Sequence, residues 1–214
     1  IQAIGVPKAN LPESLSKYSA ANITDVGTLF EPNFEVIFDL KPDLIIISAR
    51  QSDLYQELAA LAPTIYLPLD NINFMESFKY NLEVLSQIFT NENGFTSYID
   101  AIESDVSSLA TIAQGSGLNA LVIMVNSNNI SALGLGSRFD VIHSVFQVNP
   151  ADPNITVSTH GQNVNFEYIA QINPDILFVV DRGVITEGTG TAEALLNNVL
   201  VNQTNAAQQN KIIY

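Results

Sequence analysis

The chain has 214 residues, a formal net charge of −14 at pH 7, and a hydrophobic content of 47%. The negative charge argues against partners such as nucleic acid or anionic membranes, whose phosphates require a basic protein surface. The absence of cysteine excludes disulfides, thiolate catalysis and thiolate zinc sites, and no apolar run reaches the roughly 20 residues of a membrane-spanning helix.

The first 70 residues alternate between strand and helix signals. An apolar strand is predicted over residues 1–6, and Phe34–Arg50 reads as a short helix, a stop at Pro42, an apolar strand and an arginine. A helix over Ser52–Leu61 follows, with Ser52 as its expected N-cap, and residues 64–69 form another strand. This βαβ order predicts an α/β fold with a parallel sheet.

The middle of the chain is helical. Apolar residues recur at helical spacing over Phe74–Phe89 and again over Phe95–Gln114. The second helix is long enough to join two lobes, although the same periodicity also suits a helix that packs on a single sheet. We therefore predict an N-terminal α/β lobe (1–92), a linking helix (93–115) and a C-terminal α/β lobe (116–214).

The second half of the chain returns to α/β signals. A buried strand is predicted over residues 118–125, and a hairpin-like or paired strand follows over residues 127–134. Helices are predicted over Phe139–Phe146 and Thr191–Leu200, and residues 211–214 read as a closing strand.

An internal repeat links the two halves. Phe166–Arg182 matches Phe34–Arg50 at six of 17 positions, and four of the other 11 pairs exchange one aliphatic residue for another. Each copy ends in an arginine after a strand, at the edge where open α/β sheets bind ligands. The repeat predicts two similar α/β lobes that arose by duplication.

The chain contains only three arginines, Arg50, Arg138 and Arg182, and each follows a predicted strand or loop end. Forked guanidinium groups converging on one anion would explain this distribution. The alternative is a set of local salt bridges to Asp53, Asp140 and Asp181. The repeated position favours the anion site for Arg50 and Arg182, and leaves Arg138 open.

His160 lies in a loop just before the second copy of the repeat, where a metal ligand, an acid–base group and a simple loop residue are all possible. His143, inside a predicted helix, is interpreted as structural. No complete phosphate-binding loop, nucleophile elbow or zinc-protease motif is present, so an α/β enzyme that uses His160 as acid or base is the alternative from another class.

Four motifs point to a known family: SARQS (48–52), GSRFD (136–140), STHGQ (158–162) and VVDRG (179–183). With the repeats, they make nearly the whole chain similar to the bacterial substrate-binding proteins that feed iron and cobalamin ABC importers. The second half most resembles the branch that binds catecholate-type ferric siderophores.

This resemblance implies two Rossmann-like lobes with parallel sheets, bridged by a long helix, with a ligand cleft between the lobes. It implies that Arg50, Arg138 and Arg182 hold the anionic iron–catecholate complex, and that His160 ligates iron when the siderophore offers only four oxygens. The protein would then be a monomeric, non-enzymatic binder without an intrinsic cofactor. Its Fe(III) would arrive as a siderophore complex, and its partner would be the membrane permease of an ABC importer.

The resemblance also implies a location in the periplasm, or a lipid anchor on the outer face of the cytoplasmic membrane. Relatives carry a strand and helix before the position of Ile1 and a segment after the position of Tyr214, so we expect the chain to be truncated at both termini. That later segment holds a tyrosine that partners the histidine on iron. Haem, cobalamin or another metal chelate is the alternative ligand for the same fold.

Overall fold

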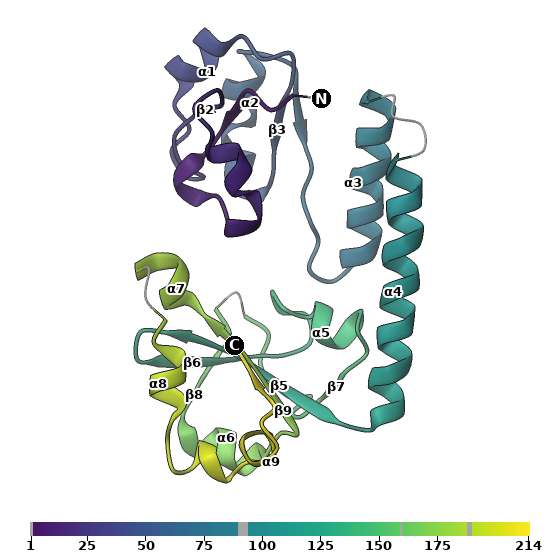
Figure 1. The fold of residues 1–214 in the computed structure, drawn as a ribbon, viewed down its shortest axis with the longest axis vertical. Helices are drawn as coiled ribbons and strands as arrows, with labels where there is room; N and C mark the ends of the chain where they lie inside the picture. The colour runs from purple at the N-terminus through teal and green to yellow at the C-terminus, as the bar shows by residue number, and fades with distance from the viewer. Residues whose placement is uncertain (1, 90–93, 159, 188–189) are drawn as a thin grey trace. The chain divides into compact units, whose positions relative to one another are not determined.

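The computed structural model describes residues 2–89, 94–158, 160–187 and 190–214 and forms two compact units (Figure 1). Unit 1 comprises Ile1–Leu69 and Ser77–Glu92, and unit 2 comprises Asp70–Glu76 and Asn93–Tyr214. The predicted lobe boundary between residues 92 and 93 lies outside the described residues.

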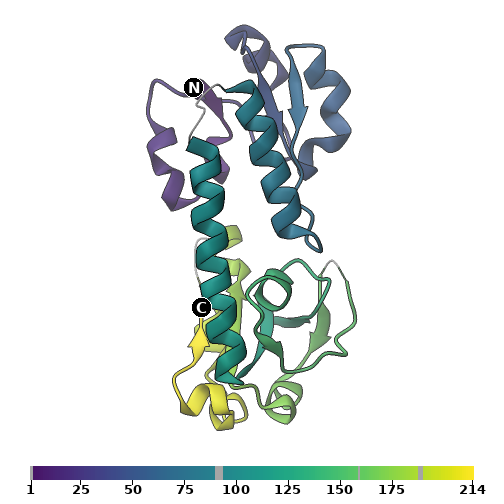
Figure 2. The same cartoon turned by 90° about the vertical axis from the view of Figure 1, so that its right-hand side faces the viewer.

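The long helix expected after this boundary is α4 (Gly94–Ser116), which Figure 2 shows as one uninterrupted helix. It belongs to unit 2. Its role as a link between two lobes stays a prediction. In the part of the chain that the structure describes, neither α4 nor any other helix has the length and apolarity required to cross a membrane.

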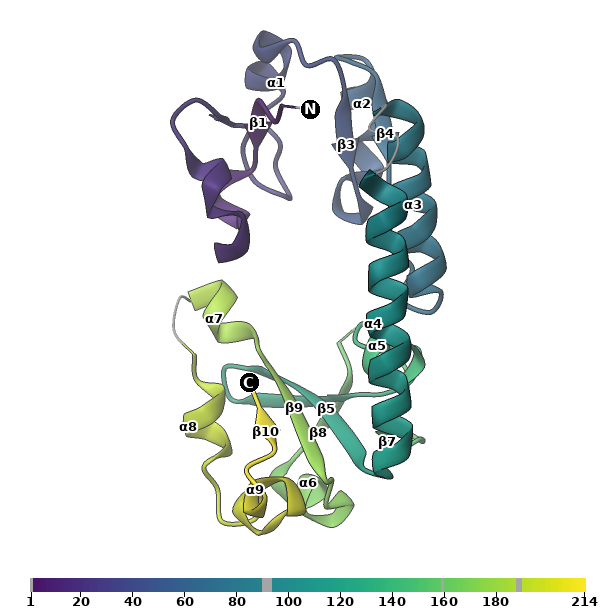
Figure 3. The same cartoon turned by 45° about the vertical axis from the view of Figure 1, so that its right-hand side comes forward.

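Unit 1 contains two short parallel sheets, β1–β2 and β3–β4 (Figure 3). Ile37 of α1, Ile47 of β3 and Leu58 of α2 form its buried core, and Leu54 and Leu61 pack against them. The elements of unit 1, which includes α3 from Ser77 onward, are β1 (Gly5–Val6), η1 (Lys8–Asn10), η2 (Glu13–Ser19), β2 (Thr24–Asp25), α1 (Phe34–Leu40), β3 (Ile45–Ile47), η3 (Ala49–Leu54), α2 (Tyr55–Ala59), β4 (Thr64–Tyr66) and α3 (Phe74–Ile88).

The helix after β3 begins earlier than predicted. Ser52 is not its N-cap, because the 3₁₀ helix η3 already begins at Ala49 and continues into α2. Ser48 takes the capping position: its backbone N–H donates to Oε1 of Gln51 at 3.5 Å, and its carbonyl accepts from the Gln51 N–H at 3.0 Å. Arg50 therefore lies inside the first helical turn after the strand.

Unit 2 is built on one sheet with the strand order β10-β9-β5-β6-β8, and β7 also pairs with β5. In Figure 3, β10, β9 and β5 lie in succession across it. Besides α4, the elements of unit 2 are β5 (Asn119–Asn126), β6 (Asn129–Leu133), α5 (Val141–Ser144), β7 (Asn149–Pro150), β8 (Gln162–Val164), α6 (Phe166–Ile172), β9 (Ile176–Asp181), α7 (Arg182–Glu187), α8 (Ala192–Leu196), η4 (Val201–Gln203), α9 (Asn205–Gln208) and β10 (Ile212–Ile213).

The predicted α/β class is confirmed, and the sheets are rich in parallel pairs. Strands β7, β9 and β10 all enter the sheet of unit 2 in parallel pairings. Strand β6 is antiparallel to both β5 and β8, so the sheet is mixed. The hairpin predicted after residue 125 explains the reversal: Ser127 adopts φ 54° in the two-residue turn between β5 and β6.

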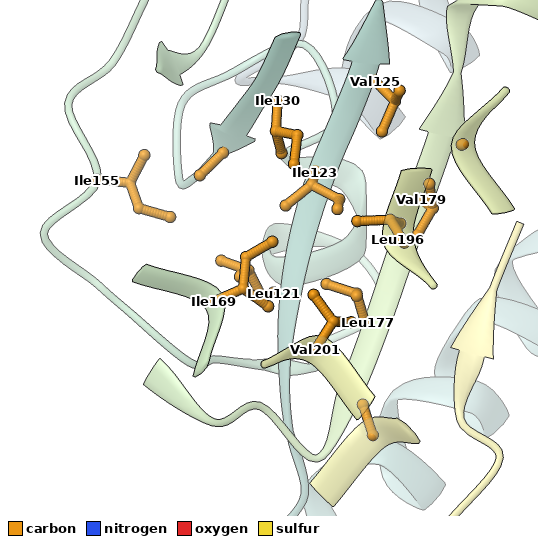
Figure 4. Close-up of a cluster of buried hydrophobic side chains, with 13 residues drawn as sticks. Leu121, Ile123, Val125, Ile130, Ile155, Ile169, Leu177, Val179, Leu196 and Val201 are labelled. Atoms are coloured by element: carbon orange, nitrogen blue, oxygen red, sulfur yellow. The ribbon is translucent and has the colours of Figure 1, made fainter. Parts of the chain in front are cut away.

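Strand β5 is buried on both faces, as its unbroken apolar sequence predicts. Leu121, Ile123 and Val125 point into the main core, where they meet side chains of α6, α8 and β9 (Figure 4). The alternate residues Val122 and Met124 belong to a second cluster on the opposite face. A parallel strand covered on both sides has no polar face to expose.

Two of the predicted helices of unit 2 are shorter than expected. The helix predicted over 139–146 is reduced to α5, and the helix predicted over 191–200 ends at Leu196 before η4 begins. At this second break, Oδ1 of Asn198 accepts the backbone N–H of Leu200 at 2.9 Å. Such local side-chain bonds compete with the helical ladder and favour a turn.

The internal repeat has the same local structure in both copies. Helix α1 is capped by Asn33, whose Oδ1 accepts from the Val36 N–H at 3.1 Å, and α6 is capped by Asn165 in the same way, at 2.9 Å from the Tyr168 nitrogen. Both helices end on a left-handed residue before proline, with φ 48° at Lys41 and φ 49° at Asn173. The predicted stop before each proline is confirmed.

Replacing Asn165 with alanine is expected to lower the free energy of unfolding by about 1 kcal/mol, because the Tyr168 N–H loses its acceptor. Urea denaturation followed by far-UV circular dichroism measures the change. Asn165→Ser is the matched control, since serine also caps helices and should stay within a few tenths of a kcal/mol of the unsubstituted protein. Equal losses for both variants would contradict the capping role.

Candidate functional site

The four side chains predicted from the sequence to bind ligand, those of Arg50, Arg138, Arg182 and His160, are all exposed. Arg50 lies in unit 1, and the other three lie in unit 2. A guanidinium is a permanent cation with five N–H donors and no acceptor, so exposed arginines are suited to hold anionic oxygens.

Arg50 stacks on an aromatic ring in unit 1. Its Cζ lies 4.7 Å from the centroid of the Phe30 ring. Phe30 comes from the loop between β2 and α1, which approaches η3 because Nε2 of Gln51 donates to the carbonyl oxygen of Leu29. Sequence reasoning did not identify Phe30, because the contact joins residues that are 20 positions apart and follows no periodic pattern.

Arg138 lies in the turn between β6 and α5. Its neighbour Phe139 packs on the cluster formed by Val122, Met124 and Leu133, so the turn is anchored to one face of the sheet. Asp140, its predicted salt-bridge alternative, is buried, and Oδ1 of Asp140 is among the buried side-chain atoms of the described residues that lack a hydrogen-bond partner. Such an atom is a natural position for an ordered water.

His160 lies in a turn that approaches the Arg138 turn. Strand β8, which follows His160, pairs with β6, which precedes Arg138, and Gln162 is opposite Ala132. Gly161 makes this approach possible, because it has φ +78° and a Cβ there would lie 2.7 Å from the Ala132 carbonyl oxygen. The Ser158 hydroxyl donates to the Gly161 carbonyl at 2.9 Å and braces the turn.

Arg182 begins α7 directly after β9, as the repeat predicts. The preceding carboxylate, Asp181, accepts backbone N–H groups from Ala192 at 2.8 Å, Thr191 at 2.7 Å and Gly183 at 2.9 Å. These hydrogen bonds, of which the one from the Ala192 N–H has the largest effect, hold the pKa of Asp181 below its ordinary value. The Asp181 carboxylate therefore already accepts three backbone hydrogen bonds, of the roughly four that its two oxygens can take.

The strand registers show which of these segments lie together. The Arg138 and His160 turns are neighbours, because they flank paired ends of the antiparallel strands β6 and β8. Arg182 follows the end of β9, where Asp181 is paired with Val125 near the end of β5. Phe178 and Val180 of β9 share the cluster with Phe139, so β9 and the Arg138 turn occupy one face of the sheet.

The remaining histidine is structural, as expected. His143 is buried, and its Nδ1 lies 2.9 Å from the carbonyl oxygen of Val148. In residues 2–89, 94–158, 160–187 and 190–214, no three His, Asp or Glu side chains are grouped so that they could hold a metal ion.

Comparison with known proteins identifies relatives over nearly the whole chain. A family model described as "Periplasmic binding protein" matches residues 2–214. The petrobactin-binding protein YclQ of Bacillus subtilis (strain 168) is 45% identical over 210 residues, which cover 98% of this chain and 66% of that protein. The ferric-anguibactin-binding protein FatB of Vibrio anguillarum (strain ATCC 68554 / 775) is 33% identical over 216 residues, which cover 98% of this chain and 67% of FatB.

The fold matches solved structures of such proteins. The crystal structure of YclQ superposes with a TM-score of 0.95 at 44% identity, over 99% of this chain and 74% of that one. The periplasmic catecholate-siderophore binding protein VctP from Vibrio cholerae superposes with a TM-score of 0.91 at 32% identity, over 99% of this chain and 77% of that one. The chain spans about two thirds of the length of YclQ and of FatB.

Proposed function

This chain belongs to the periplasmic binding protein family, and from that premise we propose that it binds a ferric catecholate siderophore and delivers it to an ABC importer for iron uptake. The relatives are named as binding proteins for petrobactin and ferric anguibactin. The protein acts as a binder and not as an enzyme, outside the cytoplasmic membrane, as a monomer that docks on a membrane permease.

The observation that carries the proposal is that all three arginines of this acidic chain are exposed and follow a strand, Arg50 and Arg182 in the first turn of a helix and Arg138 in a connecting turn. A ferric tris-catecholate is a compact trianion with flat aromatic faces. Arginine suits both features, because it donates charge-assisted hydrogen bonds to oxygen and stacks on rings. Arg50, Arg138 and Arg182 are the proposed anion contacts. The proposed division of the chain is an N-terminal lobe (1–92), a linking helix (93–115) and a C-terminal lobe (116–214).

A long-range difficulty is the net charge of −14, which repels an anionic ligand. At physiological salt the Debye length is about 8 Å, so distant carboxylates are largely screened. The arginine side chains that touch the complex then dominate the local field. Hard oxygen donors with one imidazole also suit Fe(III), so the lack of cysteine is no obstacle.

The test is a titration of the protein encoded by the complete reading frame with a ferric catecholate, with haem and cobalamin as comparison ligands. The chain has no tryptophan and seven tyrosines, so quenching of tyrosine fluorescence reports binding. Saturable binding of the ferric catecholate at micromolar or lower concentration is expected. Preferential binding of haem or cobalamin, or no binding at micromolar concentration, would contradict the proposal.

His160 is proposed as an iron ligand for complexes in which the siderophore supplies only four oxygens. His160→Ala is expected to weaken such a complex by roughly tenfold, about 1.4 kcal/mol, because one metal–nitrogen bond is lost. A six-oxygen complex, whose iron is already saturated, should change by less than about twofold. Fluorescence titration with both ligands measures the two losses, and equal losses would mean that His160 is a contact and not a ligand.

A further inference from the structure

The Phe30 ring is unusual because it is exposed and also stacked on a cation. Phe30 is 66% exposed, yet its ring lies against the guanidinium of Arg50, with Cζ 4.7 Å from the ring centroid. Single exposed apolar residues are common on protein surfaces and need no explanation. A guanidinium held over the ring is more specific, because the pair forms one surface that is both flat and cationic.

The loop that carries Phe30 is held in shape by its own hydrogen bonds. Oγ1 of Thr28 accepts the backbone N–H groups of Phe30 at 3.2 Å and Glu31 at 2.9 Å, and the Thr28 N–H donates to the Glu31 carbonyl at 3.0 Å. Gly27, paired with Pro32, has φ +96°, and a Cβ there would lie 2.5 Å from the Glu31 carbonyl oxygen. The loop thus presents Phe30 in a defined position.

A second set of bonds fixes this loop to the helical turn that carries Arg50. Nε2 of Gln51 donates to the Leu29 carbonyl oxygen, and Oε1 of Gln51 accepts the Ser48 N–H at 3.5 Å. The residue before Phe30 and the residue after Arg50 are therefore joined directly. The ring and the guanidinium are pre-organised, which lowers the entropy lost when a ligand orders them.

We propose that Phe30 is a specificity-determining residue that contacts the aromatic ring of the ligand, while Arg50 beside it binds the oxygens. This inference rests on the proposed function and adds a selection rule. Chelates whose donor oxygens are carried by aryl rings gain a stacking contact, whereas chelates of equal charge with aliphatic donors gain only the arginine contacts.

The experiment compares two iron complexes of equal charge and donor number. Ferric tris-catecholate and ferric tris-oxalate are both trianions with six oxygens, but only the first has aromatic rings. Phe30→Ala is expected to weaken ferric tris-catecholate by roughly tenfold and ferric tris-oxalate, measured by competition, by less than about twofold. Phe30→Tyr should retain catecholate affinity within about twofold, and Phe30→Leu should behave like alanine.

Phe38→Ala is the matched control, because Phe38 is also an exposed phenylalanine of unit 1, at 62%, and lies on the helix α1 and not in the Phe30 loop. It should leave both affinities unchanged. If the unsubstituted protein binds catecholate but not oxalate at millimolar concentration, Phe30→Ala is compared with and without Arg50→Ala: a further loss of catecholate affinity in the double variant, beyond that of Arg50→Ala, supports the ring contact, and no further loss means that Phe30 only positions Arg50.

Three results would overturn the assignment. Unchanged catecholate affinity in Phe30→Ala would remove Phe30 from the site. Equal losses for both complexes would mean that Phe30 only positions Arg50. If the unsubstituted protein binds no ferric catecholate, the proposed function itself fails, and this is distinguishable because it needs no variant.

Discussion

Replacing Ile123 with alanine is expected to lower the free energy of unfolding of unit 2 by about 2–5 kcal/mol. Ile123 lies in the middle of β5, between the paired strands β6 and β9, and its exposed fraction is 0%. The substitution removes buried methyl groups and leaves a cavity that the surrounding sheet fills only partly. Urea denaturation followed by far-UV circular dichroism measures the change.

Ile112→Ala is the matched control for this prediction. Ile112 lies on α4 of the same unit and is 68% exposed, so the same chemical change should alter the free energy of unfolding by less than about 0.5 kcal/mol. If the chain unfolds in two steps, the transition of unit 2 is the one compared. A loss below about 1 kcal/mol for Ile123→Ala would contradict the central place of β5 in the core.

Local signals explain why the repeated αβ unit could be predicted from the sequence. The residue before proline avoids the α region, and both Lys41 and Asn173 adopt positive φ at the predicted stops. The buried strands were predicted because apolar runs without alternation suit a strand covered on both faces. These signals depend on neighbours in sequence, so one sequence is sufficient to read them.

The sequence also contains a signal for the start of the helix at Ala49, which the predicted start at Ser52 does not use. Ser48 and Gln51 have the spacing of a capping box, and this pair places the first turn at Ala49 instead of at Ser52. The pairing of β8 with β6 had no such signal, because its direction depends on a connection of 28 residues and on tertiary packing.

The residues of the candidate site also fall into those that a sequence pattern predicts and those that it does not. Arg50 and Arg182 stood out because a repeat marked them, and the structure places each at the beginning of a helix after a strand. Phe30 had no such mark, since a single aromatic residue in a loop is uninformative until its partner is known. Stacking on Arg50 is a tertiary contact, which no local sequence pattern encodes.

Replacing Arg182 with alanine is expected to weaken binding of a ferric catecholate by about 1.5–3 kcal/mol, or roughly 10- to 160-fold in Kd. The lost interaction is a charge-assisted hydrogen bond from a guanidinium to a catecholate oxygen, which is stronger than a bond between neutral groups. Fluorescence titration of the variant and the unsubstituted protein at the same salt concentration measures the difference.

Two further variants separate a direct contact of Arg182 from its contribution to overall charge. Lys17→Ala removes one exposed positive charge from unit 1 and so changes the net charge by the same amount, and it should change the affinity by less than about twofold if the effect of Arg182 is a direct contact. Arg182→Lys keeps the charge but loses the planar fork, so an intermediate loss is expected. If Arg182→Ala binds as tightly as the unsubstituted protein, Arg182 is not part of the site. If Lys17→Ala weakens binding as much as Arg182→Ala does, net charge and not a direct contact accounts for the effect.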